Sequence, residues 1–218
     1  MFEKKYSKFL TVLIIIIVIA LVGLLGYLGY DMIKNNRTKA NAASALQEWE
    51  TNVDSNKKND EESSDSNFEF SNDALTGSAN QTVTQYEGYN VMGKIEIPKT
   101  DVKYPILEKV TKRSIEVAVA ILYTSGDGLN QPGTTTIIGH NYRNGTFFSD
   151  NNKLSKGDKI NITDNSGTTL SYVIYDMFNA EPEDTSFMTK DTGGQTEIAL
   201  STCTDDVQQR LIILARAE

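Results

Sequence analysis

The chain is poor in residues that form covalent or metal crosslinks, with one cysteine and one histidine among its 218 residues. The single cysteine, Cys203, excludes an intramolecular disulfide, so the fold must be stabilised by packing alone. One cysteine and one histidine without other clustered ligands also fall short of a zinc site. The chain is left with one free thiol and one imidazole, His140, as candidates for reactive chemistry.

Basic surface is also scarce. The formal net charge is −8, and no basic stripe occurs outside the flanks of one apolar run. A protein that binds nucleic acid needs a basic face to neutralise phosphates. We therefore expect no nucleic acid partner, and the length leaves room for a single soluble domain with attachments.

The apolar run near the start is long enough to cross a membrane. Residues 9–30 carry no charge over 22 positions, and about 20 apolar residues span a bilayer as a helix. A cleaved signal peptide is the alternative, but its apolar core usually has only about 7 to 15 residues. We predict a cytoplasmic tail over residues 1–8 and a transmembrane helix over residues 9–30.

The positive charges beside this helix do not orient it, because three precede it and three follow it. The tail is short and the whole polar domain follows the helix, which is compatible with a cytoplasmic N-terminus and an external domain. The six basic residues are Lys4, Lys5, Lys8, Lys34, Arg37 and Lys39.

Residues 31–85 are predicted to be a juxtamembrane segment and a flexible polar linker. Good helix formers dominate up to about Trp49, so the helix could continue that far. From Thr51 to about Thr84 the sequence is polar and lacks periodicity, which is typical of a solvated stalk. Phe68 and Phe70 are exceptions in this stretch and could dock transiently on the domain.

Residues 86–218 are predicted to form a folded domain that is mainly β. Its candidate strands are short, rich in β-branched residues and separated by turn sequences. Eight strands with little helix indicate a barrel or a sandwich. Residues 211–215 are apolar without alternation, as in a strand covered on both faces, and a helical turn is expected after Asn144. The candidate strands are 91–97, 102–107, 115–122, 134–140, 159–163, 169–176, 197–202 and 210–217.

The last two predicted strands are joined by the short polar loop 204–209, which predicts a β-hairpin. Cys203 and Arg210 would be its closing pair. Directly opposed residues of antiparallel strands point to the same face, with Cα atoms about 4.5 to 5.5 Å apart. His140 ends another predicted strand, at the same kind of boundary between strand and loop.

Together these three side chains predict acyl transfer through a thioester. A cysteine attacks as the thiolate, and an imidazole can act as its base and then protonate the leaving amine. The guanidinium of Arg210 offers a fixed fork of donors to a developing oxyanion. Each residue taken alone would more often be structural: a buried thiol, a hydrogen-bonded histidine, a surface arginine.

At these residues the sequence resembles the sortase family, the cell-wall transpeptidases of Gram-positive bacteria. The family motif T-L-x-T-C matches residues 199–203, with Ala199 in place of the usual threonine. The family histidine matches His140 and the family arginine matches Arg210. Similar surroundings occur at residues 93–98 and 154–158.

The resemblance implies an eight-stranded sortase-like β-barrel with short helices, tethered to the outer face of the cell membrane. It implies that Cys203 is the nucleophile, His140 the general acid and base, and Arg210 the residue that binds substrate or stabilises the oxyanion, while Thr202 could assist at the oxyanion. The implied partners are surface proteins with a C-terminal LPXTG-like sorting signal, cut between Thr and Gly. The implied acceptor is an amine of a peptidoglycan precursor or a pilin lysine, and the anchor lies in membrane lipid.

By the same resemblance, residues 179–196 are the expected substrate-recognition loop. Glu181, Glu183 and Asp184 in this loop could hold calcium, as in some relatives, but acidic loops are usually just solvated. No cofactor is therefore expected to be required.

Three other functions stay open on the sequence. The chain could be a pilus-assembly sortase that joins pilin subunits, although no second apolar span follows the last predicted strand. It could be a cysteine peptidase that gives its thioester to water. It could also be a non-enzymatic, membrane-tethered binding module in which Cys203 is buried and inert. An anchoring sortase is the preferred prediction.

Overall fold

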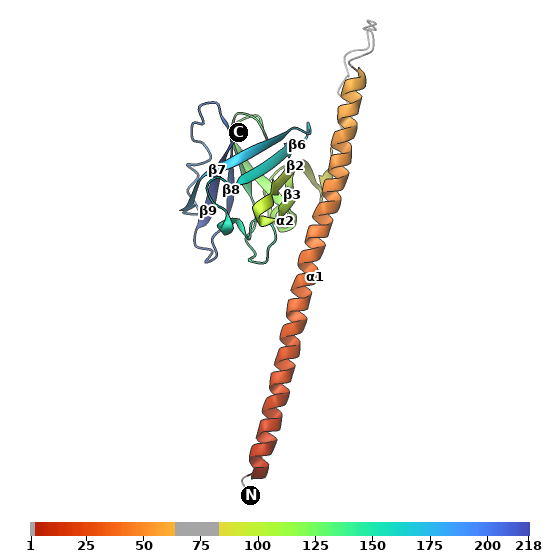
Figure 1. Ribbon diagram of the computed structural model, residues 1–218, viewed down its shortest axis with the longest axis vertical. Helices are drawn as coiled ribbons and strands as arrows, with labels where there is room; N and C mark the ends of the chain where they lie inside the picture. The colour runs from red at the N-terminus through yellow and green to blue at the C-terminus, as the bar shows by residue number, and fades with distance from the viewer. Residues whose placement is uncertain (1–2, 64–82) are drawn as a thin grey trace. The chain divides into compact units, whose positions relative to one another are not determined.

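The N-terminal part of the protein is one long helix. The computed structural model describes residues 3–63 and 83–218, and by its internal contacts the chain separates into two units, residues 1–40 and residues 41–218. The described residues of the first unit lie within helix α1 (Glu3–Ser63), drawn in red to orange in Figure 1. Side chains from residue 9 to residue 30 are exposed. Among the described residues α1 is the one helix long and apolar enough to cross a membrane, in agreement with the predicted span.

Helix α1 corrects one prediction from the sequence. A flexible stalk is expected from Thr51 onwards, but the helix continues to Ser63. Residues 64–82, which include Phe68 and Phe70, lie outside the described residues, so the stalk stays a prediction there. The correction concerns residues 51–63.

An apolar face explains why the helix continues. Ala42, Leu46, Trp49 and Val53 recur at intervals of three or four residues, which places them on one side of a helix, and all four are buried. The last three belong to a hydrophobic cluster with β-domain residues such as Val91. Most helical stability in proteins comes from packing an apolar face, and the polar composition of the segment conceals these few positions.

Polar contacts reinforce the attachment of this part of the helix to the second unit. The indole Nε1 of Trp49 donates to Oδ1 of Asn165 at 2.8 Å. Lys94 Nζ lies 2.8 Å from a carboxylate oxygen of Glu50. The second unit therefore includes a helical segment that the sequence assigns to the linker.

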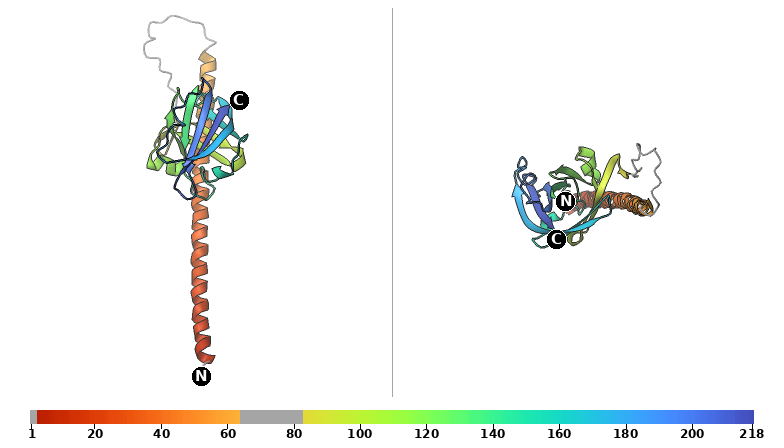
Figure 2. Two further views of the ribbon diagram at one scale, coloured as in Figure 1. Left: turned by 90° about the vertical axis from the view of Figure 1, so that its left-hand side faces the viewer. Right: turned by 90° about the horizontal axis from the view of Figure 1, so that it is seen from above.

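Strands β2 to β9 form a closed barrel (Figure 1; Figure 2). Their order is β2-β3-β4-β5-β8-β9-β7-β6, and β6 pairs back with β2 to close the sheet. The β3–β4 and β5–β8 pairs are parallel and the other pairs are antiparallel. The predicted eight-stranded barrel is confirmed, with a short additional strand, β1 (Gln85–Tyr86), on β2. The barrel strands are β2 (Tyr89–Ile97), β3 (Val102–Leu107), β4 (Val119–Thr124), β5 (Gly133–Ile138), β6 (Lys159–Asp164), β7 (Thr169–Ala180), β8 (Thr196–Cys203) and β9 (Arg210–Ala217).

The last strand is covered on both faces, as its uninterrupted apolar sequence predicts. Ile213 and Ala215 belong to the cluster that fills the barrel. Ile212 and Leu214, which point the other way, belong to an outer cluster that contains Phe187. Successive residues of a strand point to opposite faces, so β9 is sandwiched between the barrel core and the segment that joins β7 to β8.

One predicted strand is partly wrong. Residues 115–122 are expected to be extended, but helix α2 (Lys112–Val117) occupies the first part and β4 begins only at Val119. A capping box starts the helix: Ser114 N donates to Thr111 Oγ1, and Thr111 N donates to Ser114 Oγ. The β-branched residues of this segment suggest a strand, but the cap and burial against the sheet favour one short helix. The helical turn expected after Asn144 is present as a 3-10 helix, η2 (Asn151–Lys153).

Candidate active site

Cys203 and Arg210 form the closing pair of the β8–β9 hairpin, as predicted. They are registered partners at the ends of the two strands, and Nη1 of Arg210 donates a hydrogen bond to Sγ of Cys203. In the loop beyond them, Thr204 N donates to Gln209 O at 3.0 Å. The hairpin thus places a guanidinium directly on the only thiol of the chain.

His140 reaches the same end of the barrel through a parallel strand. Strand β5 runs alongside β8, with Ile138 opposite Ser201, and Gly139 N donates to Ser201 O at 3.2 Å. Since parallel strands end at the same edge, His140 leaves β5 where β8 delivers Cys203. Gly139 allows a close approach here, because a Cβ at this position would lie 2.7 Å from the ring of Phe148.

The environment of His140 favours its neutral form. Its ring stacks on Tyr142, with centroids 4.7 Å apart. Burial lowers the pKa of His140, the charge of Arg210 lowers it too, and the carboxylate of Glu116 partly opposes both effects. Among the described residues the imidazole makes no hydrogen bond to the thiol, and such bonds are often loose before substrate binds.

This pKa predicts the pH dependence of any reaction in which His140 is the base. The imidazole accepts a proton only when neutral, so activity is lost as the pH falls through the lowered pKa. We expect the acidic limb of kcat/KM for thioester formation to lie below the ordinary histidine value of about 6.5. Glu116→Gln removes the opposing charge and should move this limb lower still.

The measurement is the pH profile of thioester formation for the native protein and the variant. Asp127→Asn, which makes the same charge change at an exposed loop position, serves as the control and should leave the limb in place. An acidic limb above 6.5, or no movement in Glu116→Gln, would contradict the assignment of this limb to His140.

Asn141 and Asp205 link the histidine segment to the cysteine hairpin. The side-chain Nδ2 of Asn141 donates to Cys203 O at 3.0 Å and to Oδ1 of Asp205 at 2.8 Å. No role for either residue follows from the sequence. The only signal in the sequence is position: Asn141 directly follows His140, and Asp205 lies two residues after Cys203.

Thr202 lies on the opposite face of β8 from Cys203, because neighbouring residues of a strand alternate. Its side chain is 2% exposed, and its hydroxyl has no hydrogen-bond partner among the described residues. A pocket of about 270 Å³ is lined by Thr202 and Cys203 together with eight other residues. The expected help of Thr202 at an oxyanion remains a prediction.

The segment 181–195 between β7 and β8 covers the outer face of β8. Phe187 and Met188 are buried in the outer cluster with Ala199, which lies on the same face of β8 as Cys203. This position beside the cysteine strand is compatible with the predicted role of residues 179–196 in substrate recognition.

Two of the carboxylates proposed for calcium in this segment accept hydrogen bonds from other residues, and calcium binding stays a prediction. Oε1 of Glu181 accepts from Gln209 Nε2 at 2.8 Å, and Oδ1 of Asp184 accepts from Ser186 N at 2.9 Å. Glu183 is exposed. Within residues 3–63 and 83–218, no group of three or more His, Cys, Asp or Glu side chains is placed to hold a metal ion.

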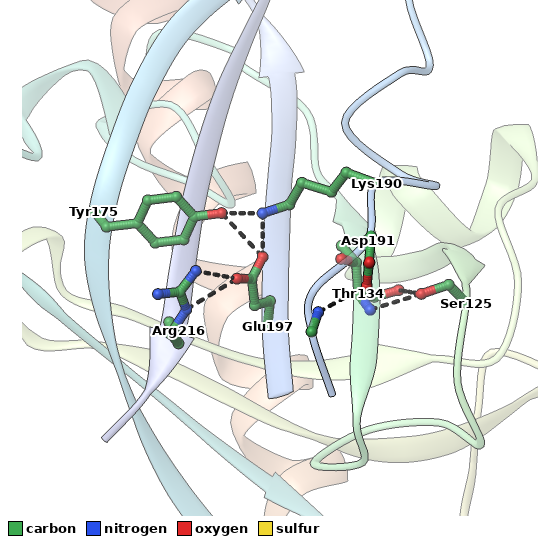
Figure 3. Close-up of polar contacts among 8 residues, drawn as sticks. Ser125, Thr134, Tyr175, Lys190, Asp191, Glu197 and Arg216 are labelled. Atoms are coloured by element: carbon green, nitrogen blue, oxygen red, sulfur yellow. Dashed lines mark hydrogen bonds and ion pairs between the residues drawn. The ribbon is translucent and has the colours of Figure 1, made fainter. Parts of the chain in front are cut away.

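A buried carboxylate attaches this segment to the barrel (Figure 3). Glu197 on β8 is 1% exposed and accepts two hydrogen bonds from Arg216 on β9, from Nη2 at 2.7 Å and from Nε at 3.0 Å. Tyr175 OH on β7 donates to its other oxygen at 2.9 Å, and Lys190 from the segment pairs with that same oxygen. Burial raises the pKa of Glu197, but the bonds from Lys190 and Arg216 outweigh burial and hold it below the ordinary value.

We expect Glu197→Gln to lower the free energy of unfolding by about 1–3 kcal/mol, because two cations lose a buried counter-charge. The loss should be largest at neutral pH. A depressed carboxyl pKa stabilises the fold above the unfolded value of about 4.3, and this contribution disappears as the pH falls through the lower folded value. Chemical denaturation at pH 7 and below pH 4 measures both effects.

Glu183→Gln, an exposed change in the same segment, is the matched control and should stay within about 0.5 kcal/mol of the native protein. Equal stabilities of the two variants at pH 7 would show that the Glu197 cluster contributes nothing.

Comparison with known proteins places the chain in a family. Residues 95–218, more than half of the chain, match the Sortase domain. The chain is 29% identical over 114 residues to Sortase A of Bacillus anthracis, and this match spans 52% of the chain and 52% of that protein. The chain thus matches about half the length of this relative.

Solved sortases have a similar fold. Sortase C-1 from Actinomyces oris is 29% identical with a TM-score of 0.54, covering 59% of this chain and 73% of its own. A pilus-related sortase C of Group B Streptococcus is 25% identical with a TM-score of 0.54, covering 59% and 67%. A sortase D5 transpeptidase of Clostridium perfringens, at 20% identity, shows the fold alone, with a TM-score of 0.61 and coverage of 82% and 99%.

The closed barrel and the matched domain define the class as proteins with a sortase domain. The chain belongs to the sortase family.

Proposed function

We propose that the protein is a membrane-anchored cysteine transpeptidase. It cleaves an LPXTG-like sorting signal and transfers the surface protein that bears the signal to an amine acceptor of the cell wall. One observation carries the proposal: the guanidinium of Arg210 contacts the thiol of Cys203 at the strand edge where β5 delivers His140. This arrangement combines a nucleophile, a base and a fixed donor for an oxyanion.

In the first step, Sγ of Cys203 attacks the carbonyl carbon of the threonine in the signal, and its proton passes to the imidazole of His140. The C–S bond forms as the C–N bond to glycine breaks. The imidazolium returns the proton to the leaving amine. Arg210 donates hydrogen bonds to the carbonyl oxygen while it carries negative charge.

In the second step, an amine takes the place of the departed glycine and the thioester becomes an amide. The proposed acceptor is an amine of a peptidoglycan precursor. Helix α1 would anchor the protein by a single pass, with the catalytic domain outside and the N-terminus in the cytoplasm. No cofactor takes part in this chemistry.

A pilus-assembly role is the second candidate, in which the acceptor is a pilin lysine. It is favoured by the likeness of this chain to sortases of class C, one of them pilus-related. The acceptor amine distinguishes the two roles, since both use the same thioester.

The proposed function is tested by the intact mass of the full chain in detergent micelles after incubation with LPXTG-like peptides. A mass increment on Cys203 that an added amine discharges into a ligated product is the expected result. Discharge only to water would indicate a peptidase. A thiol that gains no mass with any peptide and reacts slowly with thiol reagents would indicate a binding module.

A further inference from the structure

The pocket beside Cys203 is lined mostly by side chains that have no role in the first step of the proposed reaction. Its volume is about 270 Å³. Met177 and Leu211 pack against the core that contains Phe148, and these side chains form an apolar wall. Polar residues form the remainder. The residues that line the pocket are Asn141, Phe148, Asn152, Met177, Asn179, Thr202, Cys203, Thr204, Asp205 and Leu211.

The pocket and the segment 181–195 lie on opposite sides of the cysteine strand. Thr202, with Leu200 before it in the barrel core, faces inward, whereas Ala199 belongs to the outer cluster that segment 181–195 covers. Cys203 ends the strand and borders the pocket. A thioester on Cys203 can therefore be approached from the pocket, on the side of the strand away from segment 181–195.

One charged side chain indicates that a polar ligand belongs in the pocket. Asp205 is the one charged residue of those lining the pocket. Its oxygens each accept one amide donor, from Asn141 at 2.8 Å and Asn152 at 3.3 Å. A carboxylate has about four acceptor positions, so capacity for further donors remains.

We propose that this pocket is the binding site for the acceptor, a primary amine that arrives as its ammonium ion and is held by the carboxylate of Asp205. A carboxylate attracts an ammonium and gives it a charge-assisted hydrogen bond. The apolar wall formed by Phe148, Met177 and Leu211 suits the methylene chain of a lysine-type amine. The inference rests on the proposed function, because the pocket has an acceptor to bind only if Cys203 forms a thioester.

An ammonium has no free lone pair, so the acceptor must lose a proton before it attacks. The bound ammonium gives one proton to solvent and becomes a free amine. Its lone pair forms a bond to the thioester carbon, and the C–S bond breaks with its electron pair on Sγ. The second proton leaves the nitrogen for the imidazole of His140 and then neutralises the thiolate, so the products are an amide and the thiol.

The test measures how the thioester partitions between amine and water. The full chain in detergent micelles is acylated with an LPXTG-type peptide, and amide and acid products are quantified as the concentration of N-acetyl-lysine amide increases. Asp205→Asn should raise the amine concentration for half-maximal amide formation about tenfold, because one charge-assisted bond is lost. Acylation and hydrolysis should stay at the native rates.

Two controls separate this role from a structural one. Asp206→Asn makes the same charge change one residue away, outside the pocket lining, and should leave the half-maximal concentration unchanged. Hydroxylamine, a small nucleophile that is neutral at pH 7.5, should react equally with native protein and Asp205→Asn. An equal effect of both substitutions, or an equal loss with both nucleophiles, would overturn the inference.

A chain that never acylates would overturn the proposed function, and the inference with it. If the native chain acylates normally and Asp205→Asn uses the amine as well as Asp206→Asn does, the inference alone is overturned.

Discussion

Arg210→Ala is expected to slow thioester formation by about 10²–10³-fold, the usual cost of removing one oxyanion donor. The native guanidinium already contacts Sγ of Cys203, so its donors lie where the carbonyl oxygen of a bound peptide would gain charge. The residue closes a hairpin at the end of β9 and is not part of the barrel core. The substitution should therefore reduce activity and leave the fold intact. Single-turnover mass spectrometry of the full chain with an LPXTG-like peptide measures the rate.

Arg210→Lys is the matched variant, and it should recover little of the lost rate. An ammonium keeps the charge but cannot reproduce the planar fork of a guanidinium. Circular dichroism should show the same barrel in both variants. A folded Arg210→Ala protein that acylates at the native rate would remove Arg210 from the mechanism, and full activity of Arg210→Lys would reduce its role to charge alone.

Trp49→Ala is expected to destabilise the second unit by about 3–5 kcal/mol, the usual range for removing a large aromatic side chain from a core. Trp49 is 2% exposed and packs in a cluster with Leu46, Val53 and barrel residues. Its indole also holds Asn165 in the β6–β7 turn. Loss of the side chain leaves a cavity between helix and barrel. The effect is measured by thermal or chemical unfolding of the full chain, followed by circular dichroism.

Glu48→Ala is the control, because this neighbouring side chain is exposed on the same helix and should change stability by no more than about 0.5 kcal/mol. Trp49→Phe should lie between the two, since it keeps part of the buried ring and loses the bond to Asn165. Trp49 is also the only tryptophan of the chain, so its fluorescence reports directly on the helix contact. Similar unfolding midpoints for Trp49→Ala and Glu48→Ala would mean that the helix segment adds no stability to the barrel.

The parts of the site that lie close together in the chain could be predicted from the sequence. Cys203 and Arg210 are separated by one tight loop, so strand pairing alone decides that they face each other. The uninterrupted apolar sequence at 211–215 correctly predicts a strand with two covered faces, for the same local reason. Strand alternation and turn residues act over a few positions, and such signals are visible in one sequence.

The contacts between distant segments could not be predicted in this way. His140 reaches the cysteine edge because β5 pairs in parallel with β8, across a long separation in the chain. Asn141 then bonds to Cys203 O and to Asp205, and Tyr175 to Glu197. Pairings of this kind depend on which strands become neighbours in the closed sheet, which no local pattern specifies.

The sequence by itself determined the apolar span, the mainly β domain and the cysteine hairpin, because each depends on hydrophobic periodicity or turn chemistry within a short stretch. Only the tertiary structure decided that residues 42–53 pack as a helix on the barrel, and that Asp205 and Thr202 share a pocket beside Cys203. The physical reason is the same in each case. Burial and charge pairing depend on surfaces that folding brings together. The sequence alone does not say which residues will contact four spaced apolar side chains or one carboxylate.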